Sequence, residues 1–339
     1  MTRPALSVAA LAAALLTPAF AAANGELNLY SSRHYDTDER LYSDFEEMTG
    51  ITVNRIEAGA DELIERMKAE GANSPADVLL TVDAGRMWRA DQAGLLQPVE
   101  SEVLERRVPD YLQHPENHWF AFSQRARIIF YDEEDVADPP LTYADLADPR
   151  YEGMVCTRSS SNIYMLSLMA SIIEHQGEEA AREWAEGVWN NRARDPQGGD
   201  TDQLRAVVSG ECDIVVSNTY YFARALRKDV EGVTGSAEMF GWTFPNQSST
   251  GTHVNVSVGG VAANAPNREN AVRFLEYLAS DAAQEYFSAG NDEYPAVPGV
   301  ALAPSVAELG YFRSDDLNLS ALGENQAQAQ MIYDSVGYE

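Results

Sequence analysis

The sequence predicts an α/β fold of two lobes, each a mostly parallel sheet flanked by helices, with two strands forming a hinge between them. Two observations lead to this fold class. Short apolar segments of strand type alternate with segments whose apolar residues recur at helical spacing. The alternation is interrupted at residues 118–134 and again at residues 239–263, where strand character continues without a helix. We interpret the two interruptions as places where the chain crosses between lobes.

The first third of the chain consists of three strand–helix units. The predicted strands are residues 26–31, 51–58 and 76–83, and the helices that follow them are residues 36–50, 60–71 and 84–96. The helical pattern is clear in the first unit, where Leu41, Phe45 and Met48 form one apolar stripe before Gly50. Because strands joined by helical connections pair in parallel, these units predict a mostly parallel sheet with helices on both faces.

The alternation of strands and helices returns between the two interruptions. Strand 153–159 is followed by helix 162–177, and strand 211–218 is followed by another helix. The predicted first lobe takes residues 24–121 and 253–300, and the second takes residues 122–252 and 301–339. Two lobes joined by paired strands can close over a ligand, an arrangement more typical of binding proteins than of enzymes.

The first 23 residues have the pattern of a secretory signal peptide. Arg3 precedes an apolar run from Ala5 to Leu16, and small residues at Ala19 and Ala21 fit an Ala-x-Ala cleavage site. The alternative is a helix that begins the fold. Since no later segment approaches the roughly 20 apolar residues needed to span a bilayer, we expect an exported, soluble protein.

The chain is strongly acidic. Its formal net charge is −29, and removal of Arg3 with the signal peptide would bring it to −30. Nucleic acids and anionic membranes are bound through cationic patches, so this balance argues against both as partners. The only two lysines are Lys68 and Lys228.

Cys156 and Cys212 are the only cysteines. In an oxidising compartment such a pair is a candidate disulfide, whereas two cysteines alone cannot complete a zinc site. Each lies eight residues before a tyrosine, Tyr164 and Tyr220 respectively. We therefore predict that the cysteines lie at matching heights on two neighbouring strands, bonded to each other within the second lobe.

Four tyrosines and one histidine follow the ends of predicted strands. They are His34 and Tyr35 after strand 26–31, Tyr164 after strand 153–159, and Tyr220 and Tyr221 after strand 211–218. Adjacent residues point to opposite faces of a strand, but at a turn into a helix both can lean into one space. Ligands of α/β proteins bind at the carboxyl ends of strands, so these side chains are expected to face one cleft. The alternative is that the tyrosines are half-buried packing aromatics.

The chemistry of this set favours ferric iron. Phenolate is a hard anionic ligand, and imidazole is compatible with iron. Free tyrosine ionises near pH 10, so only a strong Lewis acid makes it a good ligand at neutral pH. Calcium and magnesium would call for carboxylates and carbonyls, and zinc for thiolates or several histidines.

Five motifs, LYSSRHYDTD, ADVLLTVDAGR, ARDPQGGDTDQ, SNTYYFARAL and NDEYPAVPGV, resemble those of the periplasmic ferric iron-binding proteins of bacterial ABC importers. That family is a transferrin-like, tyrosine-rich branch of the type II two-lobed periplasmic binding proteins, and the resemblance covers essentially the whole mature chain. It implies Fe³⁺ bound by His34 and Tyr35 of the first lobe with Tyr164, Tyr220 and Tyr221 of the second. It also implies a periplasmic monomer that delivers iron to an inner-membrane permease, and a subgroup that needs no synergistic anion.

Four phenolates around Fe³⁺ leave a net charge of −1, which requires positive charge nearby. We predict Arg125 and Arg224 as the compensating partners, while Arg33 and Arg127 also lie near site-forming segments. For each arginine an ordinary ion pair is the alternative. The segment TRSSSN before Tyr164 predicts a helix N-terminus able to hold carbonate or another small anion, or simply a Ser-rich cap.

Two other functions compete with iron capture. The same fold could bind a small organic solute, for which an arginine clamp or an aromatic box would be expected. A secreted hydrolase is the other, but the chain has no G-x-S-x-G, H-E-x-x-H or P-loop motif. We therefore expect a binding protein and not an enzyme.

Overall fold

The computed structural model describes residues 25–33 and 35–338. The predicted signal peptide (1–23) and the predicted ligand His34 lie outside the described residues. The strands are β1 (Gly25–Ser31), β2 (Ile51–Glu57), β3 (Val78–Thr81), β4 (Phe120–Asp132), β5 (Val155–Cys156), β6 (Ile214–Asn218), β7 (Phe240–Thr243), β8 (Val254–Val261) and β9 (Tyr294–Pro295). The helices are α1 (Glu39–Thr49), α2 (Ala60–Glu70), α3 (Ala84–Gln92), α4 (Glu102–Arg107), α5 (Ile163–Asn190), α6 (Asp200–Val208), α7 (Thr219–Arg227), α8 (Arg268–Leu278), α9 (Asp281–Asn291), α10 (Pro304–Ala307), α11 (Ser320–Glu324) and α12 (Gln326–Ser335).

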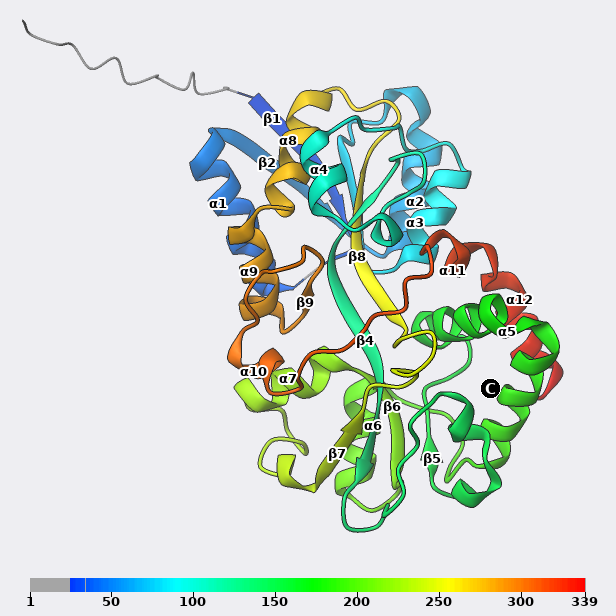
Figure 1. Cartoon of the computed structure of the whole chain (residues 1–339). Helices are drawn as coiled ribbons and strands as arrows, with labels where there is room; N and C mark the ends of the chain where they lie inside the picture. Colours follow the sequence, from blue (N-terminus) through cyan, green and yellow to red (C-terminus); the bar gives the residue numbers. More distant parts are fainter. Residues whose placement is uncertain (1–24, 34, 339) are drawn as a thin grey trace, which may run out of the picture.

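Two long strands connect the lobes. β4 and β8 run side by side through the middle of the molecule and pair antiparallel, from Phe120 opposite Gly259 to Ala126 opposite Val254 (Figure 1). The strand order is β2-β1-β3-β8-β4-β6-β5, so β8 borders the strands of the first lobe and β4 those of the second. Parallel pairing joins β1 to β2 and β3, and β5 to β6, while the crossing strands pair antiparallel. The predicted two-lobed α/β fold with a two-strand hinge is confirmed.

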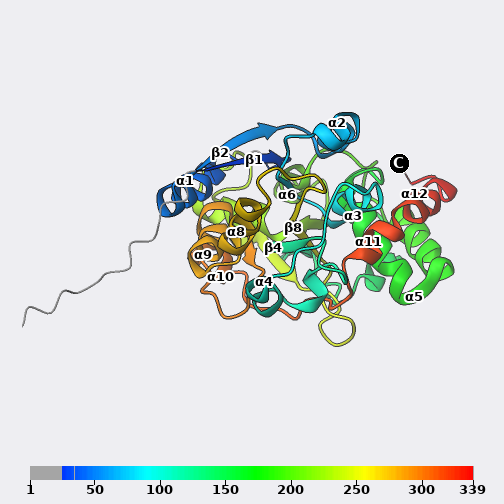
Figure 2. The ribbon, with the colours of Figure 1, turned by 90° about the horizontal axis from the view of Figure 1, so that it is seen from above.

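Each lobe has its own apolar core, and the C-terminal tail contributes to both. Leu322 of α11 is buried in the core of the first lobe, whereas Ile332 and Tyr333 of α12 are buried in that of the second. A Cβ atom on Gly323 would lie 2.4 Å from the Trp88 ring, which shows how closely α11 approaches α3. Seen from above, α11 lies against α3 and α12 against α5 (Figure 2). The tail therefore packs across the two lobes.

Within residues 25–33 and 35–338, no helix is both long enough and apolar enough to cross a bilayer.

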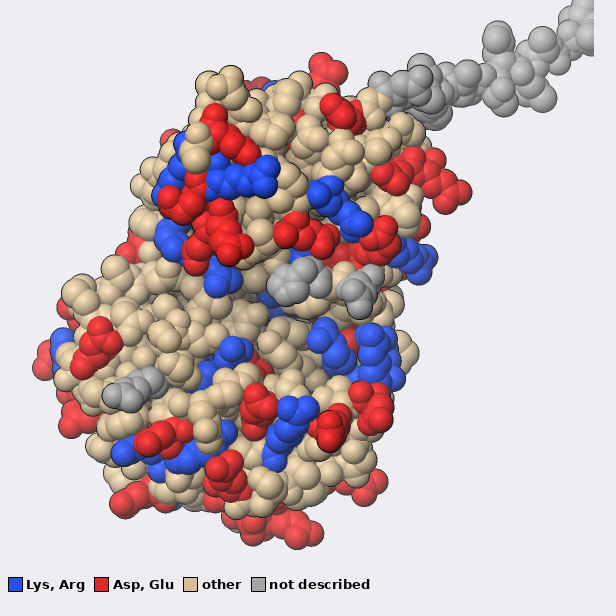
Figure 3. Space-filling model, turned by 180° about the vertical axis from the view of Figure 1, so that it is seen from behind, with Lys and Arg blue, Asp and Glu red and all other residues tan. Residues whose placement is uncertain are grey.

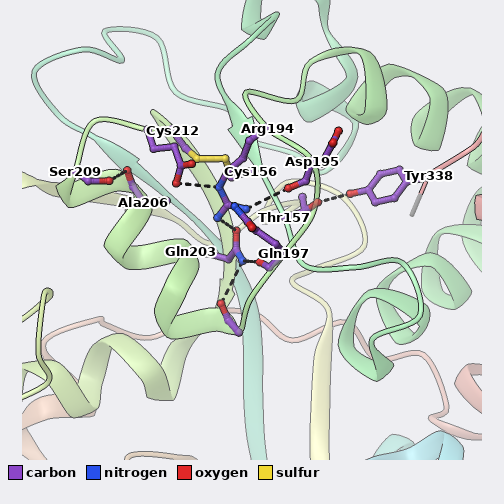
Figure 4. Close-up of a disulfide and its surroundings, with 12 residues drawn as sticks. Cys156, Thr157, Arg194, Asp195, Gln197, Gln203, Ala206, Ser209, Cys212 and Tyr338 are labelled. Atoms are coloured by element: carbon purple, nitrogen blue, oxygen red, sulfur yellow. Dashed lines mark hydrogen bonds and ion pairs between the residues drawn. A yellow bond between two sulfur atoms is a disulfide. The ribbon is translucent and has the colours of Figure 1, made fainter.

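A disulfide bond joins Cys156 and Cys212, with their Cα atoms 5.9 Å apart (Figure 4). Cys156 ends β5 and lies opposite Val215 of β6, so the bond links the two strands at their shared edge. Beside the bond, Gln203 donates from its amide nitrogen to the carbonyl of Gln197 (Figure 4). The predicted disulfide is confirmed, and it fixes the two strands that lead to Tyr164 and to Tyr220.

Replacing both cysteines (Cys156→Ser/Cys212→Ser) should lower the free energy of unfolding by about 4 kcal/mol, because a long covalent loop would no longer restrict the unfolded chain. Guanidinium denaturation of variant and wild type measures the difference. As a control, thiol titration of the unreduced, unfolded wild type should find no free thiol, and two reactive thiols would contradict the bond.

Candidate metal centre between the lobes

Four tyrosines from three chain segments line one cavity of about 340 Å³. Tyr35 follows β1, Tyr164 is the second residue of α5, and Tyr220 and Tyr221 lie in the first turn of α7. The expectation that strand ends bring these side chains to one cleft therefore agrees with the structure. What the sequence left open was whether adjacent tyrosines could serve one space, and the first helical turn of α7 allows it.

The two strand-to-helix junctions of the second lobe orient three of the tyrosines. Asn218 is the last residue of β6 and the N-cap of α7, so Tyr220 and Tyr221 lie in the first turn of the helix directly after the strand. The rings of Tyr220 and Tyr221 lie with their centroids 4.0 Å apart and their planes inclined by 31°. At the other junction, the side chain of Asn162 accepts a hydrogen bond of 3.0 Å from the backbone N–H of Tyr164. This is an N-cap, and it fixes the start of α5 beside the cavity.

Arg224 of α7 connects tyrosines of both lobes. Its guanidinium carbon lies 5.3 Å from the ring centre of Tyr220 and 6.0 Å from that of Tyr35. Arg224 also faces the buried carboxylate of Asp292, 3.7 Å away. The predicted neighbour Arg224 therefore lines the cavity, and the two lobes are close together around it.

Arg125 of β4 is the second predicted neighbour, and it is fully buried. It donates from Nη2 to the carbonyl of Val82 at 2.5 Å, while its Nε and Nη1 have no hydrogen-bond partner among the described residues. Its positive charge acts on the phenols, lowering the pKa of Tyr35 and of Tyr220 against the larger opposing effect of burial. Arg125 is therefore a source of positive charge for the cavity.

Two further arginines line the cavity and were not among the predicted residues. Arg158 pairs with the buried Asp200 at 2.5 Å, and its guanidinium carbon lies 5.4 Å from the ring centre of Tyr164. Arg86 reaches the cavity from α3 of the first lobe. Arg158 belongs to the TRSSSN segment that suggested an anion site, so its position could have been inferred. Nothing in the sequence around Arg86 marked it.

The other two arginines near the predicted site, Arg127 and Arg33, bind buried polar groups around it. Arg127 donates to Asp200 at 2.7 Å and to Asn218 at 3.0 Å. Arg33 donates to Asp38 at 2.8 Å and lies 3.3 Å from a carboxylate oxygen of Glu293. Glu293 is also buried, and its charge raises the pKa of Tyr35 further, after burial itself.

Burial keeps the phenols protonated when the cavity holds no cation. The pKa of Tyr220 is raised well above its usual value, first by burial and then by the neighbouring Tyr164 and Tyr35. The pKa of Tyr221 is also raised, by burial and then by Tyr164 and Asp200. These phenols lose their protons only when a highly charged cation replaces the protons.

Basic and acidic side chains are interspersed over the face seen from behind. Lys and Arg side chains lie on both sides of the band where the lobes meet, with Asp and Glu side chains among them (Figure 3). In a chain with a net charge of −29, the positive charge at the cavity comes from Arg86, Arg158 and Arg224, which line it.

Comparison with known proteins identifies the family. The family model for bacterial extracellular solute-binding proteins matches residues 73–312. This chain belongs to that family. Iron uptake protein A1 of Synechocystis is 52% identical over 315 residues, which cover 93% of this chain and 88% of the relative. The resemblance to ferric iron-binding proteins indicated by the motifs is thus confirmed.

Solved structures agree with this assignment across the whole fold. The Trichodesmium protein FutA (IdiA), solved in complex with iron and citrate, is 51% identical, with a TM-score of 0.90 over 93% of this chain and 100% of that one. The ferric binding protein of Campylobacter jejuni is 39% identical, with a TM-score of 0.85 over 92% of this chain and 100% of that one.

Arg125→Gln should raise the pKa of Tyr35 and Tyr220 still further, because it removes a positive charge that favours their phenolate forms. Ultraviolet titration of the iron-free protein, compared with a Tyr220→Phe variant to assign the transition, measures this shift. Arg125→Lys, which keeps the charge, is the control. An unchanged phenol titration in folded Arg125→Gln would show that Arg125 does not act on the tyrosines.

Proposed function

We propose that this protein is the periplasmic binding component of an ABC importer that captures ferric iron between its lobes and delivers it to a permease in the inner membrane. The observation that carries the proposal is the convergence of four buried or half-buried phenols on one cavity. The iron uptake protein of Synechocystis and the iron-bound FutA of Trichodesmium, both about half identical to this chain, support it.

Tyr35, Tyr164, Tyr220 and Tyr221 are the proposed iron ligands, together with His34. Each tyrosine exchanges its phenolic proton for the metal, so Fe³⁺ brings three positive charges against four phenolates and leaves −1. The guanidinium groups of Arg125, Arg158 and Arg224 offset this charge from positions beneath or along the cavity. Ca²⁺ and Mg²⁺, which prefer carboxylate and carbonyl oxygens, have a poor donor set here.

Carbonate or another small anion would bind in the same cavity as the metal. Arg158 and Arg224 line the cavity from the second lobe, and the start of α5 lies next to Tyr164. Helix N-termini and arginine forks both favour carboxylates. The presence of citrate with iron in the Trichodesmium structure supports an anion in this position.

The proposed function also implies how the chain is divided and where the protein acts. Residues 1–23 form the signal peptide, residues 24–121 with 253–300 the first lobe, and residues 122–252 the second. Residues 301–339 are predicted from the sequence to belong to the second lobe, but their helices α11 and α12 pack on both lobes. The mature protein acts as a monomer in the periplasm. It transports its ligand without chemical conversion, and its acidic surface keeps it away from nucleic acids.

Tyr220→Phe and Tyr221→Phe should each bleach or strongly shift the charge-transfer colour of the ferric protein and weaken iron binding by about a hundredfold or more, since even changes beyond the ligands can cost 10–100-fold. Visible absorbance and calorimetric titration with ferric citrate measure both effects. His34→Ala should act more mildly, because three proposed ligands lie in the second lobe.

Tyr131→Phe is the matched control, since Tyr131 is a half-buried phenol of β4 that does not line the cavity. Wild-type iron affinity in both cavity variants would refute the ligand assignment. A wild-type protein that stays colourless with ferric citrate would refute iron capture itself and leave an organic solute as the ligand.

Acidification should release iron in two steps, because protons compete with the metal for every phenol and for His34. An imidazole with an ordinary pKa of about 6.5 is protonated in mild acid and then no longer binds iron. The ligands of the first lobe should therefore dissociate from iron before those of the second. Small-angle scattering recorded alongside visible absorbance should show an open but still coloured species. Loss of colour in one step without that species would show that the lobes release iron together.

A further inference from the structure

Two histidines and an aspartate form a compact cluster on the first lobe, separate from the tyrosine cavity. Asp91 lies near the end of α3, and His114 and His118 lie in the turn that leads into β4. His118 Nδ1 is 2.5 Å from one carboxylate oxygen of Asp91, and His114 Nε2 is 3.4 Å from the other. One donor atom from each residue lies within 4.8 Å of the others, and no other such group occurs in the described part of the chain.

The backbone holds the two histidines in place. The turn is closed by hydrogen bonds from His114 N–H to the carbonyl of Trp119 and from Asn117 N–H to the carbonyl of His114, both 2.9 Å long. The imidazole rings stack with centroids 4.7 Å apart and planes inclined by 7°, and the fully buried Trp119 contacts the edge of His114. The three side chains are therefore held close together before any ligand arrives.

We propose that Asp91, His114 and His118 bind a divalent cation of the zinc type through two imidazole nitrogens and one carboxylate oxygen. Ligand atoms of a tetrahedral zinc ion lie about 3.3 Å apart, given zinc–ligand distances of about 2.0–2.1 Å. The distances to Asp91 are 2.5 and 3.4 Å, and all three donor atoms lie within 4.8 Å of one another. To reach the tetrahedral spacing, the stacked imidazole rings must turn out of their parallel arrangement, because each nitrogen binds a metal in the plane of its own ring. Two imidazoles and one carboxylate suit zinc and its transition-metal neighbours better than calcium or magnesium.

The cluster is open enough for a cation to enter and for water to complete its shell. The side chains of Asp91, His114 and His118 are 8%, 11% and 22% exposed. The high negative charge of the protein raises the local concentration of cations. Three protein ligands and one water form a common zinc arrangement.

Cation binding also requires a change of tautomer in His114. His114 Nδ1 accepts a hydrogen bond of 3.1 Å from the backbone N–H of Glu116, so the neutral ring carries its proton on Nε2, facing Asp91. A cation at Nε2 moves the ring proton to Nδ1. The backbone N–H of Glu116 then donates its hydrogen bond to water, which is possible because the turn is exposed. The bound cation ties α3 to the turn before β4, so it stabilises the first lobe without touching the iron ligands.

Calorimetric titration of the iron-loaded protein with Zn²⁺ tests the site while the tyrosine cavity is occupied. One equivalent should bind, and His118→Ala and His114→Ala should each weaken binding by about tenfold or more. His175→Ala is the matched control, because His175 is 26% exposed and pairs with a single carboxylate, Asp315, at 2.8 Å. It should bind zinc as the wild type does.

A second measurement does not depend on iron or on the folding of the histidine variants. Co²⁺ added to the iron-free Tyr220→Phe/Tyr221→Phe protein should give the visible spectrum of a tetrahedral site with nitrogen and oxygen donors. The proposal is overturned if the iron-loaded wild type binds no zinc, if His114→Ala/His118→Ala binds it equally well, or if no tetrahedral cobalt spectrum appears.

Discussion

The removal of four phenol groups from bulk water into one cavity is the constraint on which the rest of the structure depends. Burial raises the pKa of Tyr35, Tyr220 and Tyr221, so these three phenols stay neutral when no cation is near. Isolated buried anions are very unfavourable, and only a highly charged cation makes several phenolates stable together. The same burial that disfavours small charges therefore suits the trivalent ion that we propose as the ligand, and the surrounding arginines would offset the remaining charge.

The disulfide and the short parallel strands determine how well the second lobe is organised before it meets a ligand. Cys156 and Cys212 clamp β5 to the start of β6, and the chain passes from these strands directly into the turns that carry Tyr164 and Tyr220. The bond therefore restricts the relative motion of three of the four tyrosines. A preorganised set of ligands loses less conformational entropy when it binds.

Buried polar contacts join segments of the two lobes. The buried carboxylate of Asp83, the N-cap residue of α3, accepts hydrogen bonds from Asn255 of β8 at 2.5 Å and from Ser167 of α5 at 3.0 Å. Arg227 of α7 pairs with Asp292 at 2.7 Å, beyond the end of α9. Because a buried carboxylate that loses its hydrogen-bond donors is costly, these contacts favour the relative position of the lobes seen in this structure.

The sequence by itself determined the alternation of strands and helices, the two crossings that form the hinge, the disulfide and the positions of the tyrosines at strand ends. These features follow from local patterns, because apolar periodicity and the placement of residues just after a strand can be read without knowing the rest of the fold. Gly177 shows the same point: the predicted helix 162–177 ends where α5 has a non-helical residue, with φ of 84°. Tertiary structure alone decided that Arg86 lines the cavity, that Glu293 lies near Tyr35, and that the tail packs on both lobes. Each of these depends on distances between segments far apart in the chain, such as the contact of Arg33 with Glu293, and no local pattern specifies such distances.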